Sequence, residues 1–145
     1  MKRYFFLFVL LLALLSILSC KSVTSTQDSS DYLIKEILSN IQYDFNFSHL
    51  DSLYQYIHPD FLHKDRNKNA EIDYWENLFY KYSYLSIKDI EVQRINYYKA
   101  KVKFNLVFQN TTQITEYNEP SQEFGDLSYF FYDNGKWYLI GKDNF

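Results

Sequence analysis

The segment that most constrains the fold is a stretch in which apolar and polar side chains alternate. From Lys99 to Gln109, the apolar positions are Ala100, Val102, Phe104, Leu106 and Phe108. Because successive side chains of a β-strand point to opposite faces, this pattern predicts a strand with one buried face. The other face, which we expect to meet water, carries Lys101, Lys103, Asn105 and Gln109. Such a strand is typical of an antiparallel sheet that is covered on one side.

Further strands are predicted on both sides of this one. Residues 127–132 and 136–140 flank Asp133-Asn134-Gly135, and Asn-Gly supplies the positive φ angles of a tight hairpin turn. Residues 85–95 alternate only in part but are rich in β-branched side chains. Residues 111–117 either continue the central strand, turning at 118–121, or form a loop.

Three stretches with helical spacing come before these strands. The first follows a cap at residues 29–31, the second follows a cap at Ser48 and ends at Pro59, and the third runs from about Ala70 to Tyr82 after a polar loop, residues 64–69. Their apolar positions are Ile34, Ile37, Leu38, Ile41 and Phe45, then Leu50, Leu53, Tyr54 and Ile57, then Ile72, Trp75, Phe79 and Tyr82. Helices followed by an antiparallel meander predict an α+β fold.

The first twenty residues are organised like a secretory signal. Basic Lys2 and Arg3 precede an apolar run from Phe5 to Leu18, which is too short to span about 30 Å of hydrocarbon comfortably. Ser19 stands directly before Cys20, the sole cysteine of the chain. This arrangement resembles the lipobox of bacterial lipoproteins, although Ile17 and Leu18 depart from its usual residues. The resemblance implies a signal peptide over residues 1–19 and lipidation of Cys20.

Two alternatives to lipidation remain open. An uncleaved anchor helix needs a longer apolar stretch, because residues 21–27 are polar at once. Cleavage at an ordinary signal site would use Ser16 and Ser19. Lipidation also removes a free thiol from an oxidising compartment. We therefore expect a protein held in the cell membrane or outer membrane by palmitate-type acyl chains on Cys20, with its domain outside the cytoplasm.

The remaining chain divides into two parts. Residues 20–30, Cys20 and a Ser/Thr-rich stretch, are expected to form a lipidated flexible tether, and residues 31–145 a single domain. Without Lys2 and Arg3, 13 basic side chains face 18 acidic ones. A chain of this sign lacks the cations that neutralise phosphates, so we expect no nucleic-acid partner.

Two short segments carry a second resemblance. His58-Pro59-Asp60-Phe61 follows the second helix, and Asp133-Asn134-Gly135-Lys136-Trp137-Tyr138-Leu139-Ile140 closes the sheet. With the order of elements, they resemble the nuclear-transport-factor-2-like superfamily over about residues 31–142. The resemblance implies a cystatin-like cone in which a curved antiparallel sheet wraps the N-terminal helices. This fold serves isomerases, cyclases, dehydratases and many non-enzymatic proteins, so it leaves the function open.

Candidate site residues are the large side chains expected to face the interior of the cone. The ligand-pocket candidates are Trp75, Phe79, Phe104, Phe108 and Trp137. Isomerases of this fold use an aspartate base and a Tyr–Asp oxyanion hole. Here the inward face of the central strand is wholly apolar. In the following segment, either Asp126 and Ser128 or Leu127 and Tyr129 face inward. We predict no catalytic residue and no cofactor, and the large aromatic side chains favour a filled cone.

A histidine and aspartate cluster was tested as a metal site. His58, Asp60, His63 and Asp65 include side chains that can bind zinc. Pro59 breaks the helix that would align the two imidazoles. We therefore expect a solvent-exposed turn and no metal.

These observations together predict a non-catalytic binding or assembly domain of a membrane-anchored envelope lipoprotein, with a purely structural envelope component left open. The alternative is a small-molecule-binding or isomerase-like enzyme with an aromatic pocket in the cone. The expected partner is an envelope protein or a small hydrophobic ligand. Self-association through the outer sheet face would bring Lys101 and Lys103 against their copies, so we expect a monomer.

Overall fold

The computed structural model describes residues 24–145, so the expected signal peptide and Cys20 lie outside the described residues. The chain divides into two units, Met1–Tyr32 and Leu33–Phe145. Of the first unit the structure describes residues 24–32, which are helical. The second unit contains the sheet and the remaining helices. Within residues 24–145, no helix has the length and apolar character needed to cross a membrane.

Helix α2 (Thr24–Asn46) begins before the predicted cap at residues 29–31. Residues 24–30, which were expected in the tether, are helical, and they contain neither the Pro nor the Gly that would stop a helix. The predicted apolar stripe within the second unit is confirmed. Its fully buried members are Ile34, Leu38, Ile41 and Phe45.

The second predicted helix is a short 3₁₀ helix, η1 (Leu50–Gln55). The predicted cap at Ser48 is wrong, because Ser48 has φ 65° and His49 stands at the N-cap without a side-chain hydrogen bond. An N-cap side chain needs an extended backbone to reach the first turn, and left-handed Ser48 lacks it. After η1 the chain runs beside the last strand, where His58 N donates to Leu139 O at 2.9 Å.

A small hairpin replaces the predicted polar loop. Strands β1 (Leu62–His63) and β2 (Arg66–Asn67) pair antiparallel, and Lys64 and Asp65 between them have φ 50° and 63°. Long-range contacts hold this turn: Lys64 N donates to Asp143 Oδ2 at 2.6 Å, and Lys64 Nζ to the Glu123 carbonyl at 2.7 Å. Such contacts come from distant parts of the chain and leave no local sequence signal.

Helix α3 (Lys68–Lys81) confirms the third predicted helix. Asn67 caps it, since Asn67 Oδ1 accepts a hydrogen bond from Ala70 N at 3.1 Å. Its buried face includes Glu71, Trp75 and Leu78. A carboxylate therefore shares the buried face with apolar side chains.

The main sheet has five strands: β3 (Tyr84–Arg94), β4 (Lys99–Gln109), β5 (Ile114–Glu119), β6 (Tyr129–Asp133) and β7 (Lys136–Leu139). It is not a simple meander, because β4 pairs with β3 along one edge and with both β5 and β6 along the other. The turn into β5 comes at residues 110–113, earlier than expected. Asn110 Oδ1 sets it by accepting hydrogen bonds from Thr112 N and Gln113 N.

The two faces of β4 are as the alternation predicts, with all five apolar positions buried. Strand β3 changes its inward phase at a bulge, where Asp89 has φ 55°. Leu85 and Ile87 are buried before the bulge, and Ile90 and Val92 pack against the core after it. The bulge explains why this segment alternates only in part.

The connection before β6 differs from the predicted strand over residues 127–132. Residues 126–128 form a 3₁₀ turn, η2 (Asp126–Ser128), so Asp126, Leu127, Ser128 and Tyr129 are all buried. The predicted β6–β7 hairpin is confirmed, with φ 48° at Asn134 and 84° at Gly135.

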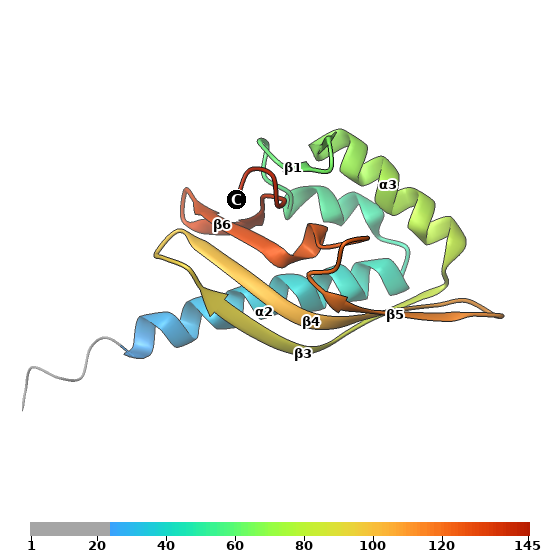
Figure 1. Cartoon of the computed structure of the whole chain (residues 1–145), viewed down its shortest axis with the longest axis horizontal. Helices are drawn as coiled ribbons and strands as arrows, with labels where there is room; N and C mark the ends of the chain where they lie inside the picture. The colour runs from blue at the N-terminus through green and yellow to red at the C-terminus, as the bar shows by residue number, and fades with distance from the viewer. Residues whose placement is uncertain (1–23) are drawn as a thin grey trace, which may run out of the picture. The chain divides into compact units, whose positions relative to one another are not determined.

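Within the second unit, α2 runs along β3 and β4, and α3 lies beyond it (Figure 1). The Asn46 amide bonds both Leu85 N and Leu85 O, at 2.7 and 2.9 Å. Gln42 Oε1 accepts from Ile87 N at 2.6 Å. These side chains satisfy the outer edge of β3 before its bulge and fix the direction of α2 against the sheet.

Candidate functional site

Aromatic rings from α2, α3, β4 and the β5–β6 connection meet between the helices and the sheet. The Phe45 ring lies edge-on to Trp75 and Phe108, at centroid distances of 6.1 and 5.9 Å. Phe108 stacks on Tyr82 at 4.9 Å and lies 5.2 Å from Phe124. All five rings are buried. This aromatic cluster packs the region between helices and sheet where the ligand-pocket candidates are expected.

The predicted pocket residues fall partly within this cluster. Trp75 and Phe108 belong to it, and the Phe79 ring joins it at 5.5 Å from Phe45. Phe104 is buried farther along β4. The structure therefore brings Trp75, Phe79 and Phe108 together as packed core side chains.

Trp137 lies apart from the aromatic cluster. Its ring is 5.2 Å from Tyr132, and the guanidinium of Arg94 stands 4.3 Å above it. Trp137 is buried, and its indole nitrogen is recorded without a hydrogen-bond partner. The Arg94 guanidinium and the Tyr132 ring therefore both pack against the indole of Trp137.

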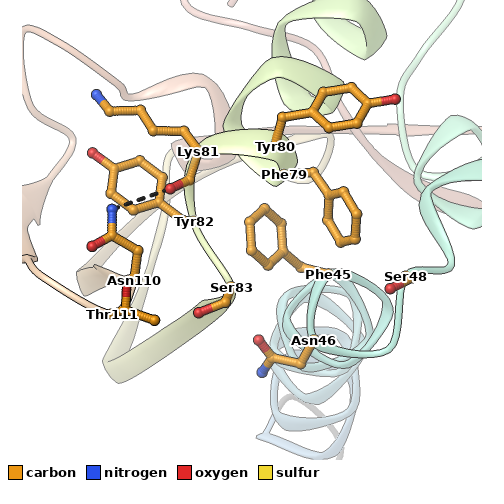
Figure 2. Close-up of a pocket in the computed structure, with 10 residues that line it drawn as sticks. All are labelled: Phe45, Asn46, Ser48, Phe79, Tyr80, Lys81, Tyr82, Ser83, Asn110 and Thr111. Atoms are coloured by element: carbon orange, nitrogen blue, oxygen red, sulfur yellow. Dashed lines mark hydrogen bonds between the residues drawn. The ribbon is translucent and has the colours of Figure 1, made fainter.

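A groove opens beside the aromatic cluster, between the C-terminal ends of α2 and α3 and the β4–β5 turn (Figure 2). We call it the α2–α3 groove; its volume is about 390 Å³. Phe45 and Phe79 face one another in it, and Tyr80 points away from them (Figure 2). Tyr80 is 86% exposed, the largest value among the exposed apolar and aromatic side chains described.

Polar side chains tie the walls of this groove together. Asn110 Nδ2 donates to Lys81 O at 3.2 Å, joining the β4–β5 turn to the end of α3 (Figure 2). Ser83 Oγ donates to Gln109 O at 3.3 Å. The Lys81 ammonium lies 5.0 Å from the Tyr82 ring centroid and is the charged group of the lining. The groove thus combines aromatic surface with one cation.

A second groove, of about 590 Å³, contains His58. His58 Nδ1 accepts a hydrogen bond from Asp60 N at 3.1 Å, and Nε2 lies 3.6 Å from Asp133 Oδ2. Because Nδ1 is an acceptor, the neutral ring carries its proton on Nε2, toward Asp133. Phe131 and Tyr138 meet the imidazole edge-on at 5.7 and 5.6 Å. Packing and hydrogen bonding therefore fix the orientation of His58.

A buried polar cluster lies on the other side of Trp75. Trp75 Nε1 donates to both Glu71 Oε1, at 3.1 Å, and Asp126 Oδ2, at 3.0 Å. Arg66 Nε donates to Glu71 Oε2 at 2.7 Å. Glu71 and Asp126 are each 1% exposed. The side chains of Arg66, Glu71 and Asp126, together with the Trp75 N–H, form what we call the polar cluster.

His63 borders the polar cluster and is also buried. His63 Nδ1 accepts from Lys142 N at 3.4 Å, so Nε2, at 3.0 Å from Phe124 O, is the donor. Burial lowers the pKa of His63, and the nearby Asp126 partly offsets that shift. The imidazole is therefore a neutral structural link between β1 and the β5–β6 connection.

Asp126 holds a proton inside the fold. Burial raises its pKa well above the usual range, and the neighbouring carboxylate of Glu71 adds to the shift. Arg66 Nε lies 2.7 Å from Glu71 Oε2, so a cation stands beside the two carboxyl groups. Burial also raises the pKa of Glu119, although hydrogen bonds from Ser121 oppose that shift. The arrangement is a neutral acid beside a carboxylate, sealed from solvent.

The sequence analysis missed most of this cluster. Glu71 lies four residues before Trp75 on the buried face of α3, a spacing that could have shown the acid among the core positions. His63 was assigned to an exposed turn, which is wrong. His58 is also buried and faces Asp133 instead of His63. Among residues 24–145, no group of His, Cys, Asp and Glu side chains could hold a metal ion.

No protein-family model matches the sequence, and no curated protein matches it either. Solved structures do. One is a protein from Novosphingobium aromaticivorans DSM 12444 described as a candidate scytalone dehydratase, with a TM-score of 0.61 and 12% identity over 82% of this chain and 85% of that one. A designed NTF2 variant has a TM-score of 0.56 and 10% identity over 74% of this chain and 91% of that one.

A third similar structure is Bd1075 of Bdellovibrio bacteriovorus, with a TM-score of 0.57 and 11% identity. The match covers 74% of this chain but only 37% of that protein. Identities this low show the fold alone. The domain therefore has the predicted α+β fold, a nuclear-transport-factor-2-like cone with its N-terminal helices packed on a curved antiparallel sheet.

Proposed function

We propose that this chain is a membrane-anchored lipoprotein of the bacterial envelope whose domain is a non-catalytic binding module for a protein partner. The lipid anchor rests on the sequence pattern before Cys20. The binding role rests on the contrast between a filled interior and an open surface groove. Each part has its own test.

The observation that carries the binding role is the packing around Trp75. One side of the indole packs against Phe45 and Phe108, and its N–H is engaged by Glu71 and Asp126. A small molecule entering here would have to displace rings that are already in contact. By contrast, the α2–α3 groove already exposes aromatic surface. Recognition is therefore assigned to the outside of the cone.

The groove suits a segment of protein that carries an aromatic or aliphatic side chain beside an acidic one. The partly buried Phe79 provides apolar surface above the buried Phe45, Lys81 provides the cation, and Tyr80 stands at the rim. Tyrosine is enriched among the residues that contribute most to protein interfaces, because its ring is large, rigid and amphipathic. We therefore expect Tyr80 to supply a large share of the binding energy.

One observation favours the alternative, a small-molecule-binding or isomerase-like enzyme. Asp126, a carboxyl group with a raised pKa, lies inside the fold beside His63. However, a general acid must reach its substrate, and this carboxyl is 1% exposed and bonded to Trp75. Neither Glu71 nor Asp126 lines the α2–α3 groove or the groove at His58. The binding role therefore fits the geometry better.

The binding role is tested by photo-crosslinking in the native envelope. A benzophenone amino acid replaces Tyr80 in the full chain, and a control chain carries it at Lys103, which is exposed on the outer face of the sheet. We expect one protein adduct from position 80 and none from position 103. The adduct partner, identified by mass spectrometry and purified, should lose about tenfold in affinity for a Tyr80→Ala chain, roughly 1.4 kcal/mol.

The opposite result would favour the alternative. If position 80 gives no protein adduct and the purified chain carries a stoichiometric small molecule, the binding-module role is wrong. The anchor is tested separately, because Cys20→Ala should abolish incorporation of labelled palmitate. Undiminished labelling of that variant would contradict the lipoprotein assignment.

A further inference from the structure

The turn between β3 and β4 exposes an apolar and aromatic tip. Ile95, Tyr97 and Tyr98 are 51%, 73% and 55% exposed, and we call these three residues the aromatic tip. The Tyr97 ring meets Tyr98 edge-on at 4.9 Å and Tyr132 at 5.9 Å. Despite these ring contacts, each of the three side chains stays more than half exposed, and exposed apolar side chains gathered in one place mark an interaction site.

The tip is held in place by hydrogen bonds. Ile95 N donates to Lys99 O at 3.0 Å and Tyr98 N to Asn96 Oδ1 at 2.9 Å, which close the turn. Tyr132 N donates to Tyr98 O at 2.8 Å, which ties the turn to β6. The rings are therefore presented at the end of a rigid sheet.

The position of the tip follows from the contacts of α2. Asn46 bonds Leu85 and Gln42 bonds Ile87, so the start of α2 in this unit and the aromatic tip lie at the same end (Figure 1). From Ile87 to the tip the strand advances about 26 Å, whereas α2 extends back about 14 Å from Gln42 to Leu33. The tip thus projects roughly 12 Å beyond the point where the chain enters the unit.

We propose that the aromatic tip inserts into the headgroup region of the phospholipid bilayer that holds Cys20, an inference that rests on the proposed lipid anchor. Residues 24–32 are helical and advance about 14 Å, and the four residues from Cys20 to Val23 add at most about 14 Å, so the anchor keeps the tip within reach of the surface. Tyrosine rings are enriched at membrane interfaces because their ring is apolar and their hydroxyl polar.

Charge around the turn agrees with a lipid surface. Arg94 stacks on Trp137 and the Lys99 ammonium donates to Phe145 O at 2.9 Å, but both place positive charge beside the tip, and residues 94–103 contain neither Asp nor Glu. Cations beside an inserted aromatic group are attracted by anionic headgroups. The α2–α3 groove lies at the far end of β3 and β4, so a domain docked by its tip leaves that groove open toward a partner.

The test places a tryptophan reporter in the full lipidated chain. The Tyr97→Trp variant is reconstituted in vesicles of phosphatidylethanolamine and phosphatidylglycerol, with and without lipids brominated near the headgroup. Tyr80→Trp is the matched control, an exposed tyrosine at the far end of the domain. Both variants also carry Trp137→Phe, because Trp137 contacts Tyr132 and so lies close to position 97, and the remaining native Trp75 is buried. We expect at least about twofold stronger quenching of the added fluorescence in Tyr97→Trp.

The possible outcomes distinguish a failure of the tip proposal from a failure of the proposed lipid anchor. If the vesicles carry the protein and Tyr97→Trp is quenched no more than Tyr80→Trp, the tip does not touch the membrane and the anchor stands. If the full chain stays unbound when the vesicles are floated, the anchor is wrong and the tip proposal falls with it. Equal, strong quenching of both variants would also overturn the proposal, since the domain would then lie flat on the bilayer.

Discussion

The two sides of Trp75 are packed by different means. Toward Phe45 and Phe108 the indole meets only rings, whereas its N–H points to Glu71 and Asp126. Ring contacts tolerate small shifts because dispersion forces are not directional. The polar side has no such tolerance, since each buried charge or donor needs its own partner. Trp75 thus joins a part of the core that tolerates small shifts in packing to a part in which each polar group needs a specific partner.

The largest loss of stability is expected when the ring contacts and the N–H hydrogen bonds of Trp75 are removed together. Trp75→Ala removes the ring from the aromatic cluster and the donor from both carboxyl groups. The free energy of unfolding should fall by about 5 kcal/mol, combining a large cavity with unsatisfied buried acids. Urea denaturation measures it, with Tyr80→Ala as a surface control within about 0.5 kcal/mol of the wild type. A loss near the control value would contradict the packing described for Trp75.

A charge change on the polar side alone should cost nearly as much. Arg66→Met leaves the buried Glu71 carboxylate without its cation, and removing one partner of a buried pair costs about 3–5 kcal/mol. The double variant Arg66→Met/Glu71→Met should recover much of that loss, because no unpaired charge remains. Additive losses in the double variant would show that the two side chains are not energetically coupled.

Removing only the indole N–H should have an intermediate effect. Trp75→Phe keeps an aromatic ring against Phe45 and Phe108 but takes the shared donor from Glu71 and Asp126. We expect a loss of about 1–3 kcal/mol, the cost of leaving a buried acceptor unsatisfied. Subtracting this value from that of Trp75→Ala gives the contribution of the aromatic side. If Trp75→Phe costs as much as Trp75→Ala, the ring contacts contribute little and the comparison fails.

The smallest effect depends on pH. Because burial raises the pKa of Asp126 in the folded protein, the native state keeps a proton that the unfolded chain releases above its ordinary pKa of 3.8. Stability from this group is fully present below pH about 4 and is lost as pH rises toward the folded pKa. Asp126→Asn lacks the titration and keeps a donor for Glu71, so the wild type should lose stability relative to it as pH rises.

The quantity to compare is the free energy of unfolding as a function of pH, measured with Asp126 and with Asp126→Asn. The lowered pKa of His63 makes stability rise with pH near its ordinary value of 6.5, opposite in sign to Asp126. Because Asp126 shifts the pKa of His63, the comparison is made in a His63→Gln background, which removes the imidazole titration from both curves measured by thermal or urea unfolding. If the chain with Asp126 gains stability relative to the chain with Asp126→Asn between pH 4 and about 7, Asp126 is charged in the fold.

The apolar side of the core around Trp75 could be predicted from the sequence. Alternation along β4 identified its buried face, helical spacing identified Trp75 in α3, and Asn134-Gly135 identified the last hairpin. These signals are local, because a strand or helix repeats its own period regardless of what it packs against. The order of such elements predicted an α+β layout, and the cone itself was implied by the family resemblance of two short segments, His58–Phe61 and Asp133–Ile140.

The polar cluster and the buried His63 beside it could not be predicted in the same way. Asp126 and His63 reach the interior through a 3₁₀ turn and a two-residue hairpin, neither of which has a period to detect. Their burial depends on partners far along the chain, such as Phe124 for His63. The bulge at Asp89 had a weak signal, the incomplete alternation of β3, whose meaning is clear only beside β4. Tertiary contacts decide each of these features.

The claim that recognition lies outside a sealed interior is tested most directly by the solvent access of Trp75. In a Trp137→Phe chain, Trp75 is the only tryptophan. Acrylamide quenching of its fluorescence then reports how often a small molecule reaches it. We predict blue-shifted emission with quenching close to that of a fully buried indole, unchanged when small apolar ligands are added. Strong quenching, or a ligand-dependent loss of quenching, would reveal an accessible pocket in the cone and would contradict the account.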